Sequence, residues 1–423
     1  MELKKGYKQT EVGVIPEDWE IFPLGELFSF SGGHTASRDQ LSGDGFCYLH
    51  YGDIHKSNKT YMNVKNEYQE IPKLNVPIKM VSQKSLLNDG DVVFVDASED
   101  DEGASKHIVV QNQDETTYIS GLHTIVSKSK NDYVYNGYKQ HCFQTADVKR
   151  QFKFYAVGTK VSGISKANIA KIQIPLPPTK AEQTAIAAAL SDADALIQSL
   201  EKLIAKKRLI KQGAMQELLK PKKGWMVKKL GEICDFQNGT SLERLFNKNE
   251  GYSVISIGNY SSSGNYVETN TFIDNVHFDE IAKFLLKKNE LTLLMNDKTS
   301  IGTIIGRVLL IEQDDKYVFN QRTMRLKPKN NYNSLFLYHL INSGLIHKKI
   351  VLLAKPGTQI YVNTNDIIDL ELFIPKPEEQ TAIATILADM DAEISAIETN
   401  LAKYKLIKQG MMQELLTGRT RLV

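Results

Sequence analysis

Residues 182–219 read EQTAIAAALSDADALIQSLEKLIAKKRLIKQGAMQELL, and residues 379–416 read EQTAIATILADMDAEISAIETNLAKYKLIKQGMMQELL. The two stretches align without a gap at an offset of 197, and 24 of the 38 positions are identical. The sequence before each copy is much less similar. A long repeat between divergent segments indicates one structural element used twice. This element decides the architecture of the chain.

Apolar residues in both copies follow the spacing of a coiled coil. Their positions step 4-3-4-3-4, which is the a/d alternation of a heptad repeat. Pro177 and Pro178 precede one copy, and Pro375 and Pro377 precede the other. Prolines suit the start of a helix and are excluded from its interior. The seam consists of Ile186, Leu190, Ala193, Ile197, Leu200 and Ile204 in the first copy and of Ile383, Leu387, Met390, Ile394, Ile397 and Leu401 in the second.

The shared register predicts that the two helices pack on each other. We expect each helix to end near Gly213 or Gly410, after about 33 residues or roughly 50 Å at 1.5 Å per residue. A pseudo-twofold axis between the halves would make the helices antiparallel. The alternative is two surface helices, each packed on its own domain.

Weaker similarity links the segments that precede the helices. Trp19 with the sequence LGEL corresponds to Trp225 with LGEI, and Gly158-Thr159 corresponds to Gly357-Thr358. Apolar runs at 91–97, 172–177, 290–296 and 302–311 predict strands, and 138–155 and 333–352 are expected to be helical. The predicted fold class is α/β, with two globular domains that alternate with two long helices pairing as an antiparallel coiled coil. The predicted boundaries are 1–178 for the first domain, 179–219 for the first helix, 220–376 for the linker and second domain, 377–417 for the second helix and 418–423 for a tail.

Composition and charge limit the class of protein. A chain of 423 residues exceeds one ordinary core. No apolar run approaches the roughly 18 residues of a membrane span, and the N-terminal region lacks the apolar core of a signal peptide. Three widely separated cysteines are expected to be free thiols in the cytoplasm. The net charge of +2 neither supports nor excludes nucleic acid.

Catalytic motifs are absent from the sequence. It contains no phosphate-binding loop of the form GxxxxGK[ST], no HExxH, no GxSxG and no paired CxxC. The acidic run at 98–102 lacks the spacing of metal ligands and is interpreted as a solvated loop. We therefore expect a binding subunit without catalytic residues, bound metal or cofactor of its own.

Three further motifs resemble one protein family. The opening YKQTEVGVIPEDWEIFPLGELF, the helix entries IPLPPTKAEQTAIA and IPKPEEQTAIA, and the helix endings LIKQGAMQELL and LIKQGMMQELLTG are similar to those of the specificity (S) subunits of type I restriction–modification systems. The resemblance covers the whole chain in the expected order.

The resemblance implies a function in sequence-specific DNA recognition. Each globular domain would be a target recognition domain that reads one half of a bipartite double-stranded DNA site, and the coiled coil would set the gap. Two methyltransferase subunits that use S-adenosylmethionine would dock on this chain, and restriction subunits that use ATP and Mg would complete the assembly. A non-catalytic scaffold that joins two protein-binding modules is the alternative, and a self-sufficient nuclease is a third reading.

Polar loops of both domains carry the residue types that read base edges. Arg suits guanine, and Asn or Gln suits adenine. Such loops are also ordinary surface turns, so each residue is a candidate only. The first domain offers His34, Thr35, Arg38, His123, Lys160, Ser162 and Lys166. The second offers Thr240, Arg244, Asn296, Lys298, Thr299, Gln321, Arg322, Gln359, Tyr361 and Asn363.

Polar residues on the outward faces of the two helices are identical in both copies. Packing within a coiled coil explains its apolar seam, but it does not explain identical polar residues. We assign them to partner docking, against shared ancestry of the repeat as the simpler explanation. They are Glu201, Lys206, Gln212, Gln216 and Glu217 in the first copy and Glu398, Lys403, Gln409, Gln413 and Glu414 in the second.

Overall fold

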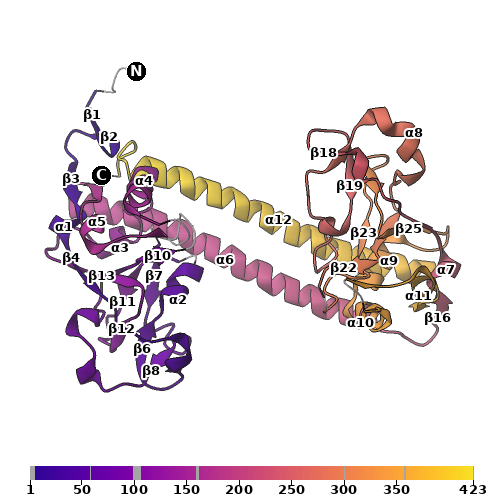
Figure 1. Cartoon of the computed structure of the whole chain (residues 1–423), viewed down its shortest axis with the longest axis horizontal. Coiled ribbons are helices and arrows are strands. Elements are labelled where there is room, and N and C mark those ends of the chain that lie inside the picture. Colours follow the sequence, from indigo (N-terminus) through magenta and orange to yellow (C-terminus); the bar gives the residue numbers. More distant parts are fainter. Residues whose placement is uncertain are drawn as a thin grey trace. The chain divides into compact units, whose positions relative to one another are not determined.

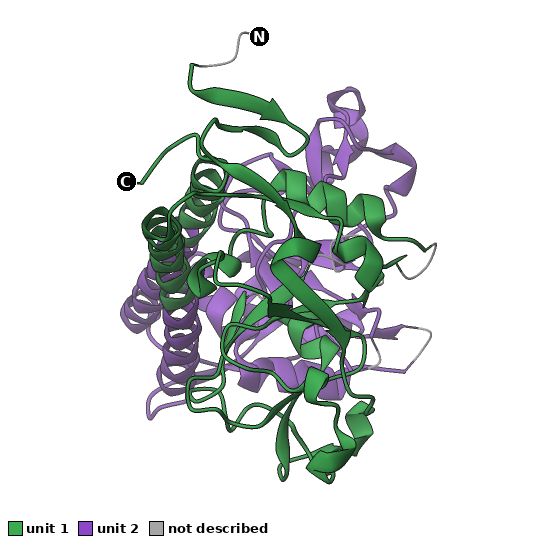
Figure 2. Cartoon of the chain, turned by 90° about the vertical axis from the view of Figure 1, so that its left-hand side faces the viewer, with its two compact units in different colours: residues 1–200, 400–423 green, residues 201–399 purple. Residues whose placement is uncertain are grey.

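The structure is a computed structural model that describes residues 5–57, 59–98, 106–158, 162–299, 301–356 and 359–422. The chain forms two compact units (Figure 2). Unit 1 comprises residues 1–200 and 400–423, and unit 2 comprises residues 201–399. Each unit therefore contains one globular part together with a segment of each long helix. Figure 1 labels the elements along the chain.

Unit 1 is built on two small sheets. Most of its described strands form a five-stranded sheet in the order β4-β13-β9-β11-β7 and a four-stranded sheet in the order β12-β6-β8-β5, and the others pair as β1-β2, β10-β14 and β15-β3. Val92, Phe94 and their neighbours in β9 are buried because this strand is central. The strands are β1 (Tyr7–Thr10), β2 (Gly13–Pro16), β3 (Glu20–Pro23), β4 (Phe28–Gly32), β5 (Leu41–Ser42), β6 (Phe46–Leu49), β7 (Tyr61–Asn63), β8 (Lys73–Leu74), β9 (Val92–Val95), β10 (Ala97–Ser98), β11 (His107–Gln111), β12 (Tyr118–Ser120), β13 (Thr124–Ser129), β14 (Ser162–Gly163) and β15 (Gln173–Leu176).

Helices cover one face of the unit 1 sheet and close its core. Phe94 of β9 packs against Phe143 and Phe152, which gives the core an aromatic centre. The short helices are α1 (Leu24–Leu27), α2 (Tyr51–Lys56), α3 (Asn136–Lys139), α4 (Ala146–Tyr155) and α5 (Lys166–Ile169).

Unit 2 repeats this plan with different sequence. Its described strands form two four-stranded sheets, in the orders β17-β25-β21-β23 and β18-β20-β19-β24. The strands are β16 (Met226–Lys229), β17 (Cys234–Asn238), β18 (Phe246–Asn247), β19 (Tyr252–Ile255), β20 (Phe272–Ile273), β21 (Leu291–Leu294), β22 (Asn296–Asp297), β23 (Val308–Leu310), β24 (Tyr317–Phe319), β25 (Thr323–Pro328), β26 (Ile360–Tyr361) and β27 (Glu371–Ile374). The short helices are α7 (Leu230–Ile233), α8 (Phe278–Ile281), α9 (Ser334–Asn342), α10 (Gly344–Leu353) and α11 (Thr364–Ile368).

Most of the expected short elements are confirmed, with two exceptions. The helical segment expected at 333–352 is α9 and α10, but the one expected at 138–155 is helical only in part, because residues 140–145 separate α3 from α4. Strands β9, β15 and β21 fall within the runs at 91–97, 172–177 and 290–296. The expected strand at 302–311 is wrong over most of its length, because only Val308–Leu310 is extended in a sheet. Gly302 and Gly306 both adopt a left-handed φ of 72°, so the chain turns twice before that strand begins.

The repeated stretches form two helices of 39 residues each, α6 (Lys180–Leu218) and α12 (Pro377–Leu415). The expectation that they end at Gly213 and Gly410 is wrong. Both helices continue because the residues beyond each glycine are apolar and pack into a core. Met215 and Leu219 join the unit 2 core, and Met411 and Leu415 join the unit 1 core.

Ion pairs within each unit show that the helix segments run antiparallel. In unit 2, Lys207 pairs with Glu393 at 2.6 Å, and Lys211 pairs with Asp391. The number in α12 falls as the number in α6 rises, which only an antiparallel pair gives. In unit 1, Lys408 of α12 donates to Asp194 of α6 at 2.5 Å. This pair is the repeat counterpart of Lys211 and Asp391, because both members are shifted by 197 residues.

The repeated Glu-Gln at the start of each long helix joins that helix to its globular part. Gln183 accepts from the Tyr135 backbone at 2.8 Å and donates to Tyr133 and Pro177 carbonyls. Gln380 accepts from the Asn333 backbone at 2.9 Å and donates to the Pro375 carbonyl. Buried amides that satisfy buried backbone groups stabilise one orientation of helix and domain.

No helix of the described residues is both long and apolar enough to cross a membrane. Cys47, Cys142 and Cys234 are free and buried. Burial raises the pKa of all three thiols, which disfavours the reactive thiolate.

Candidate nucleic-acid interface

A loop and a turn meet at one end of the unit 1 sheets. The loop after β4 forms a parallel bridge from His34 to Gly121, in the turn between β12 and β13. The buried Tyr48 hydroxyl donates to the His34 carbonyl at 2.8 Å and accepts from the Leu122 backbone at 3.1 Å. One phenol therefore holds the loop and the turn together, and Thr35 follows as an exposed residue.

Acidic residues orient the exposed basic side chains of this unit 1 patch. Arg38 donates through both terminal nitrogens to Asp53 Oδ1 at 2.8 Å. His123 Nδ1 lies 3.3 Å from Asp96 Oδ1, and the Tyr51 ring meets the imidazole edge-on at 5.5 Å. These contacts limit the rotamers of Arg38 and His123, so their remaining polar edges point in defined directions.

The remaining candidates of the first domain continue the same patch. Ser162 lies in β14, which pairs with β10 directly after Asp96. The Lys166 ammonium lies over Gly32 at the end of β4, 3.6 Å from where a Cβ would stand. Lys160 lies outside the described residues. These contacts place Ser162 and Lys166 beside the segments that carry His123 and His34.

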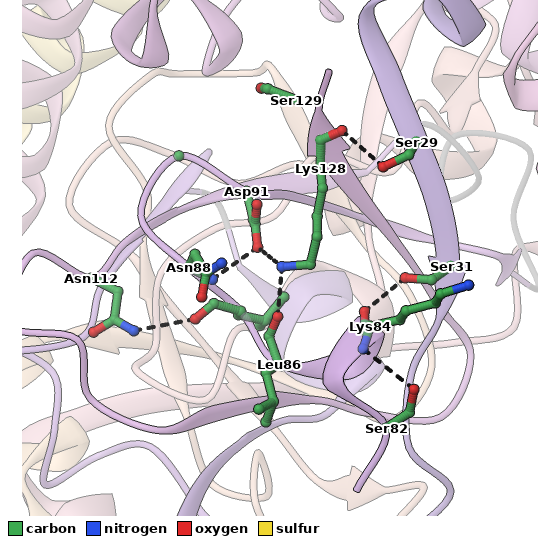
Figure 3. Close-up of polar contacts among 12 residues, drawn as sticks. Ser29, Ser31, Ser82, Lys84, Leu86, Asn88, Asp91, Asn112, Lys128 and Ser129 are labelled. Carbon is green, nitrogen blue, oxygen red and sulfur yellow. Dashed lines mark hydrogen bonds and ion pairs between the residues drawn. The ribbon is translucent and has the colours of Figure 1, made fainter. Parts of the chain in front are cut away.

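A network of polar contacts, partly buried, supports the strands that carry this patch (Figure 3). Lys128 of β13 donates to Asp91 Oδ2 at 2.5 Å and to the Leu86 carbonyl at 2.7 Å. Ser31 of β4 donates to the Lys84 carbonyl at 2.7 Å. Burial raises the pKa of Asp91, and the contact with Lys128 opposes that rise. Strands held in this way give the exposed loops a rigid base.

Unit 2 brings the corresponding loop and turn together in the same way. Thr240 forms a parallel bridge to Asn320, in the turn between β24 and β25. Asn320 and Gln321 both donate to Glu243, at 2.8 and 2.6 Å. Burial favours the neutral form of Glu243, but hydrogen bonds from Ser241, Asn320 and Gln321 outweigh it and lower its pKa to about 2. Gln321 is therefore held by a carboxylate that stays charged.

Each arginine of this second patch also has an acceptor inside the unit. Arg244 pairs with Glu280 of α8. Arg322 donates from Nη1 to Gln359 Oε1 at 2.9 Å. Gln359, which the sequence predicts as a base reader, therefore also positions Arg322.

The other candidates of the second domain surround Arg322. Asn296 in β22 pairs with Tyr361 in β26, and Asn363 precedes α11. Thr299 donates through its backbone and its hydroxyl to buried Asp297, at 2.8 and 2.9 Å. Burial opposes ionisation of Asp297, yet these bonds and one from Ile304 lower its pKa. Lys298 lies beside them with an exposed side chain.

Sequence reasoning missed the acceptors that orient these side chains. Each acceptor is distant in the sequence from the residue that it holds, or it belongs to no motif of its own. The four acceptors are Asp53, Asp96, Glu243 and Glu280. The segment YLHYGDI (48–54), which contains Asp53 and corresponds to VISIGNY (254–260) in the second half, was the available signal. A polar patch with fixed side chains, open on one side, has the chemistry needed to recognise base edges.

A second candidate surface lies on the outer faces of the long helices. Leu209 is 68% exposed and Leu406, its repeat counterpart, is 69% exposed. Ile210 and Ile407 beside them are also exposed. Helical spacing places Lys206, Gly213 and Glu217 on the same face as Leu209, opposite the apolar seam. Sequence reasoning assigned the polar residues of this face to docking and missed the exposed apolar pair.

Not all predicted docking residues lie on this outer face. Glu398 pairs with Arg208 at 2.6 Å within unit 2. Gln212, Gln216 and Glu398 line a groove of about 1560 Å³ between the helix segments and the globular part of unit 2. Glu414 of unit 1 contacts Arg419 and Thr420. The remaining predicted docking residues on the two faces, Lys206, Glu217, Lys403, Gln409 and Gln413, have exposed side chains, and Glu201 is half-buried.

Within the part of the chain that the structure describes, no group of three or more His, Cys, Asp or Glu side chains is arranged to hold a metal ion.

The sequence matches one family model twice. The model describes a type I restriction modification DNA specificity domain and matches residues 16–207 and 222–406. The chain is 24% identical to the type I restriction enzyme MjaVIII specificity subunit of Methanocaldococcus jannaschii, over 99% of this chain and 97% of the relative. It is 23% identical to the putative type I restriction enzyme MjaX specificity subunit of the same organism, over 99% and 97%.

Solved structures share the fold. The crystal structure of a type I restriction–modification S subunit from M. genitalium aligns with a TM-score of 0.57 at 13% identity and covers 98% of both chains. A chain from a study of complex assembly and conformational transition of the type I R-M system aligns with a TM-score of 0.56 at 14% identity, over 96% of this chain and 99% of that chain.

Proposed function

Because this chain belongs to the type I restriction modification DNA specificity family, we propose that it is the subunit that selects the DNA target of a type I restriction–modification complex. One observation carries the proposal. The two units repeat the same backbone frame, yet the side chains displayed at its exposed end differ. A frame used twice with different displayed groups suits a target made of two different halves.

Each patch has the properties of a DNA-reading surface. His123, Arg38 and Lys166 in unit 1 and Arg322, Arg244 and Lys298 in unit 2 supply hydrogen-bonding groups. Acceptors orient the first two of each set, so those side chains pay little further ordering cost on binding. We assign the oriented side chains to base edges and the lysines to phosphates, which position a protein on the duplex without specifying sequence.

The long helices suit the task of setting a distance. A helix of 39 residues extends roughly 58 Å at 1.5 Å per residue. Half-sites read from one face of B-DNA are spaced by about one helical turn, 34–36 Å, or a multiple. The ion pairs of Lys211 and Lys408 with their aspartates select the antiparallel register and so define which residues flank each globular part.

The outer faces around Leu209 and Leu406 suit two copies of one partner. Repeated surfaces bind repeated subunits, because each copy meets the same groups. We assign these faces to two methyltransferase subunits, with the polar residues as a rim around the exposed apolar pair. Those subunits would then bind S-adenosylmethionine, and restriction subunits would bind ATP and Mg. This chain would carry out no catalytic step. The chain would act on DNA in the cytoplasm.

Methylation mapping tests the function directly. The chain is co-expressed with its methyltransferase subunit in a host without adenine methylation, and N6-methyladenine is mapped by single-molecule sequencing. The expected result is a single motif with two specified halves and an unread gap of fixed length. A stable, S-adenosylmethionine-supplied complex that modifies no motif would contradict the proposal and favour a scaffold without DNA specificity.

Variants of the outer faces test the docking assignment separately. Leu209→Glu and Leu406→Glu place charges on the apolar pairs and should each remove one methyltransferase subunit, as measured by the mass of the complex. Val276→Glu is the matched control, because Val276 is exposed in unit 2 and lies on neither long helix. Retention of two subunits by both leucine variants would contradict the assignment.

A further inference from the structure

One turn has the same backbone in both units and a different side chain. His123, between β12 and β13, has a φ of 58°, and Arg322, between β24 and β25, has a φ of 67°. The Asp96 backbone donates to the His123 carbonyl at 3.2 Å, and the Met295 backbone donates to the Arg322 carbonyl at 2.8 Å. All of these residues are related by the same offset of 199. A non-glycine residue in the left-handed region is uncommon, and its occurrence at the same position twice marks the turn.

Neighbouring contacts hold this turn rigidly in each unit. The Thr124 hydroxyl donates to the Gly121 carbonyl at 2.5 Å, and Thr323 donates in the same way to Asn320. Gly33 and Gly239 pack closely against the turn. A Cβ added at Gly33 would lie 1.8 Å from the Gly121 carbonyl oxygen, and one added at Gly239 would lie 2.0 Å from the Asn320 carbonyl oxygen. The backbone therefore has one arrangement, and the identity of the displayed side chain is the variable.

The two displayed side chains have opposite hydrogen-bonding character. Arg322 only donates, and Gln359 Oε1 accepts one of its five N–H groups. His123 Nδ1 lies at an ion-pair distance of 3.3 Å from Asp96 Oδ1, so a proton on that nitrogen faces the carboxylate. With its one proton on Nδ1, an imidazole presents Nε2 as an acceptor. The same point of the frame offers donors in unit 2 and an acceptor in unit 1.

We propose, building on the DNA-reading function proposed above, that this turn is a specificity-determining position that makes the two half-sites differ. Arg322 reads a guanine through its O6 and N7 acceptors in the half-site of unit 2. His123 reads an exocyclic amine, the N6 group of adenine or the N4 group of cytosine, in the half-site of unit 1. These assignments follow from the donor and acceptor pattern of the major groove.

Exchange of the two side chains tests the inference. Oligonucleotides in which each base pair of the mapped motif is replaced in turn compete for binding to the complex of this chain with its methyltransferase subunits. Arg322→His should abolish a preference for one guanine in one half-site, roughly a 5- to 150-fold change in relative affinity. His123→Arg should create a preference for guanine at one position of the other half-site.

The unaltered half-site serves as the folding control in each variant, because its preferences should stay within error of the wild type. An equal loss of affinity for every oligonucleotide would overturn the inference, since it is the behaviour of a phosphate contact. So would a change of preference in both half-sites, or in neither. A wild-type complex without preference in any half-site would instead overturn the proposed function, and this inference with it.

Discussion

The first glutamate of the repeat, Glu182 in unit 1 and Glu379 in unit 2, is contacted by a different segment in each unit. In unit 2, residues 219–225 continue from α6, and Trp225 donates to Glu379 at 3.2 Å. In unit 1, the tail after α12 takes this place, and Arg421 holds both Glu182 and Asp18. The Glu182 side chain is 1% exposed, whereas that of Glu379 is 40% exposed. Identical residues at equivalent positions thus have unequal structural importance, because burial by their neighbours sets the cost of losing a partner.

Arg421→Ala should produce the largest difference between the units. It leaves the buried Glu182 carboxylate without its cation, which costs about 3 kcal/mol by analogy with other broken buried pairs. Lys222→Ala removes the cation nearest Glu379, an exposed pair, and should cost no more than about 1 kcal/mol. Hydrogen exchange read by mass spectrometry measures the opening free energy of each unit separately.

Arg421→Lys sharpens the same comparison. It keeps the charge but loses the planar fork that reaches Glu182 and Asp18 together, so its effect should be intermediate. Equal destabilisation by Arg421→Ala and Lys222→Ala would show that the burial of Glu182 does not set the cost.

A buried histidine gives each unit its own response to acid. Burial, aided by repulsion from Lys408, lowers the pKa of His141 to about 3. Burial and repulsion from Lys211 lower the pKa of His339 to about 4, with Asp391 at 4.0 Å opposing the shift. Each folded pKa lies below the ordinary value near 6.5, so each unit binds fewer protons folded than unfolded. The stability is complete above pH 6.5 and should fall by about 1–3 kcal/mol as the pH approaches 4.

Leucine substitutions separate these two contributions from the carboxylates that also titrate on acidification. His141→Leu should reduce the pH dependence of unit 1 alone, and His339→Leu that of unit 2 alone, where burial also lowers the pKa of His347 to about 4. The measurement is hydrogen exchange of each unit between pH 7 and pH 4, corrected for the intrinsic rate. A slope that is unchanged by both substitutions would contradict the assignment to the buried histidines.

The architecture could be predicted from sequence because its signal is local and repeated. The heptad seam can be recognised in the sequence, and four of its residues are buried as expected: Ile186, Leu190, Ile383 and Leu387. The sequence alone does not decide between a helix end near Gly213 and one at residue 219, because that depends on whether the residues beyond Gly213 find a core to enter. That core is formed by strands far away in the sequence.

The candidate site shows the same division. Turn residues such as His123 and Arg322 could be selected because polar residues beside Gly and Asn mark exposed loops. Their orienting partners could not, since Asp96 and Gln359 reach them only through the pairing of distant segments. Only the folded chain distinguishes a displayed group from the acceptor that holds it.

Charge reversal between the long helices tests a smaller difference between the units. Asp194→Lys places a second cation beside Lys408, and Asp391→Lys places one beside Lys211. The first should cost about 1–2 kcal/mol and the second less, because the Asp194 side chain is 21% exposed and that of Asp391 is 43% exposed. Denaturant unfolding of each variant measures the difference.

The double variant Asp194→Lys with Lys408→Asp should recover most of the lost stability, because it restores opposite charges at the same two positions. A double variant as unstable as the sum of its single variants would show that the two residues do not interact.

The helix glycines offer the last and smallest test, and here the two units should respond alike. An added Cβ at Gly213 or Gly410 would meet no atom within 4 Å. Alanine in an exposed helix interior is more favourable than glycine by about 0.5–1 kcal/mol, so Gly213→Ala and Gly410→Ala should each stabilise the isolated chain.

Gly213 and Gly410 lower the stability of their helices, and no contact within the described part of the chain requires a residue so small. The close approach of a partner's backbone at these positions would explain both glycines. Both alanine variants should therefore weaken binding of the methyltransferase subunit about tenfold while they raise stability. Binding is followed by titration of the purified chain with that subunit, with Ala205→Gly as a control for helix propensity at an exposed position. Stabilisation with unchanged binding would separate the two glycines from docking, and it would leave the exposed leucines Leu209 and Leu406 as the groups on which that assignment depends.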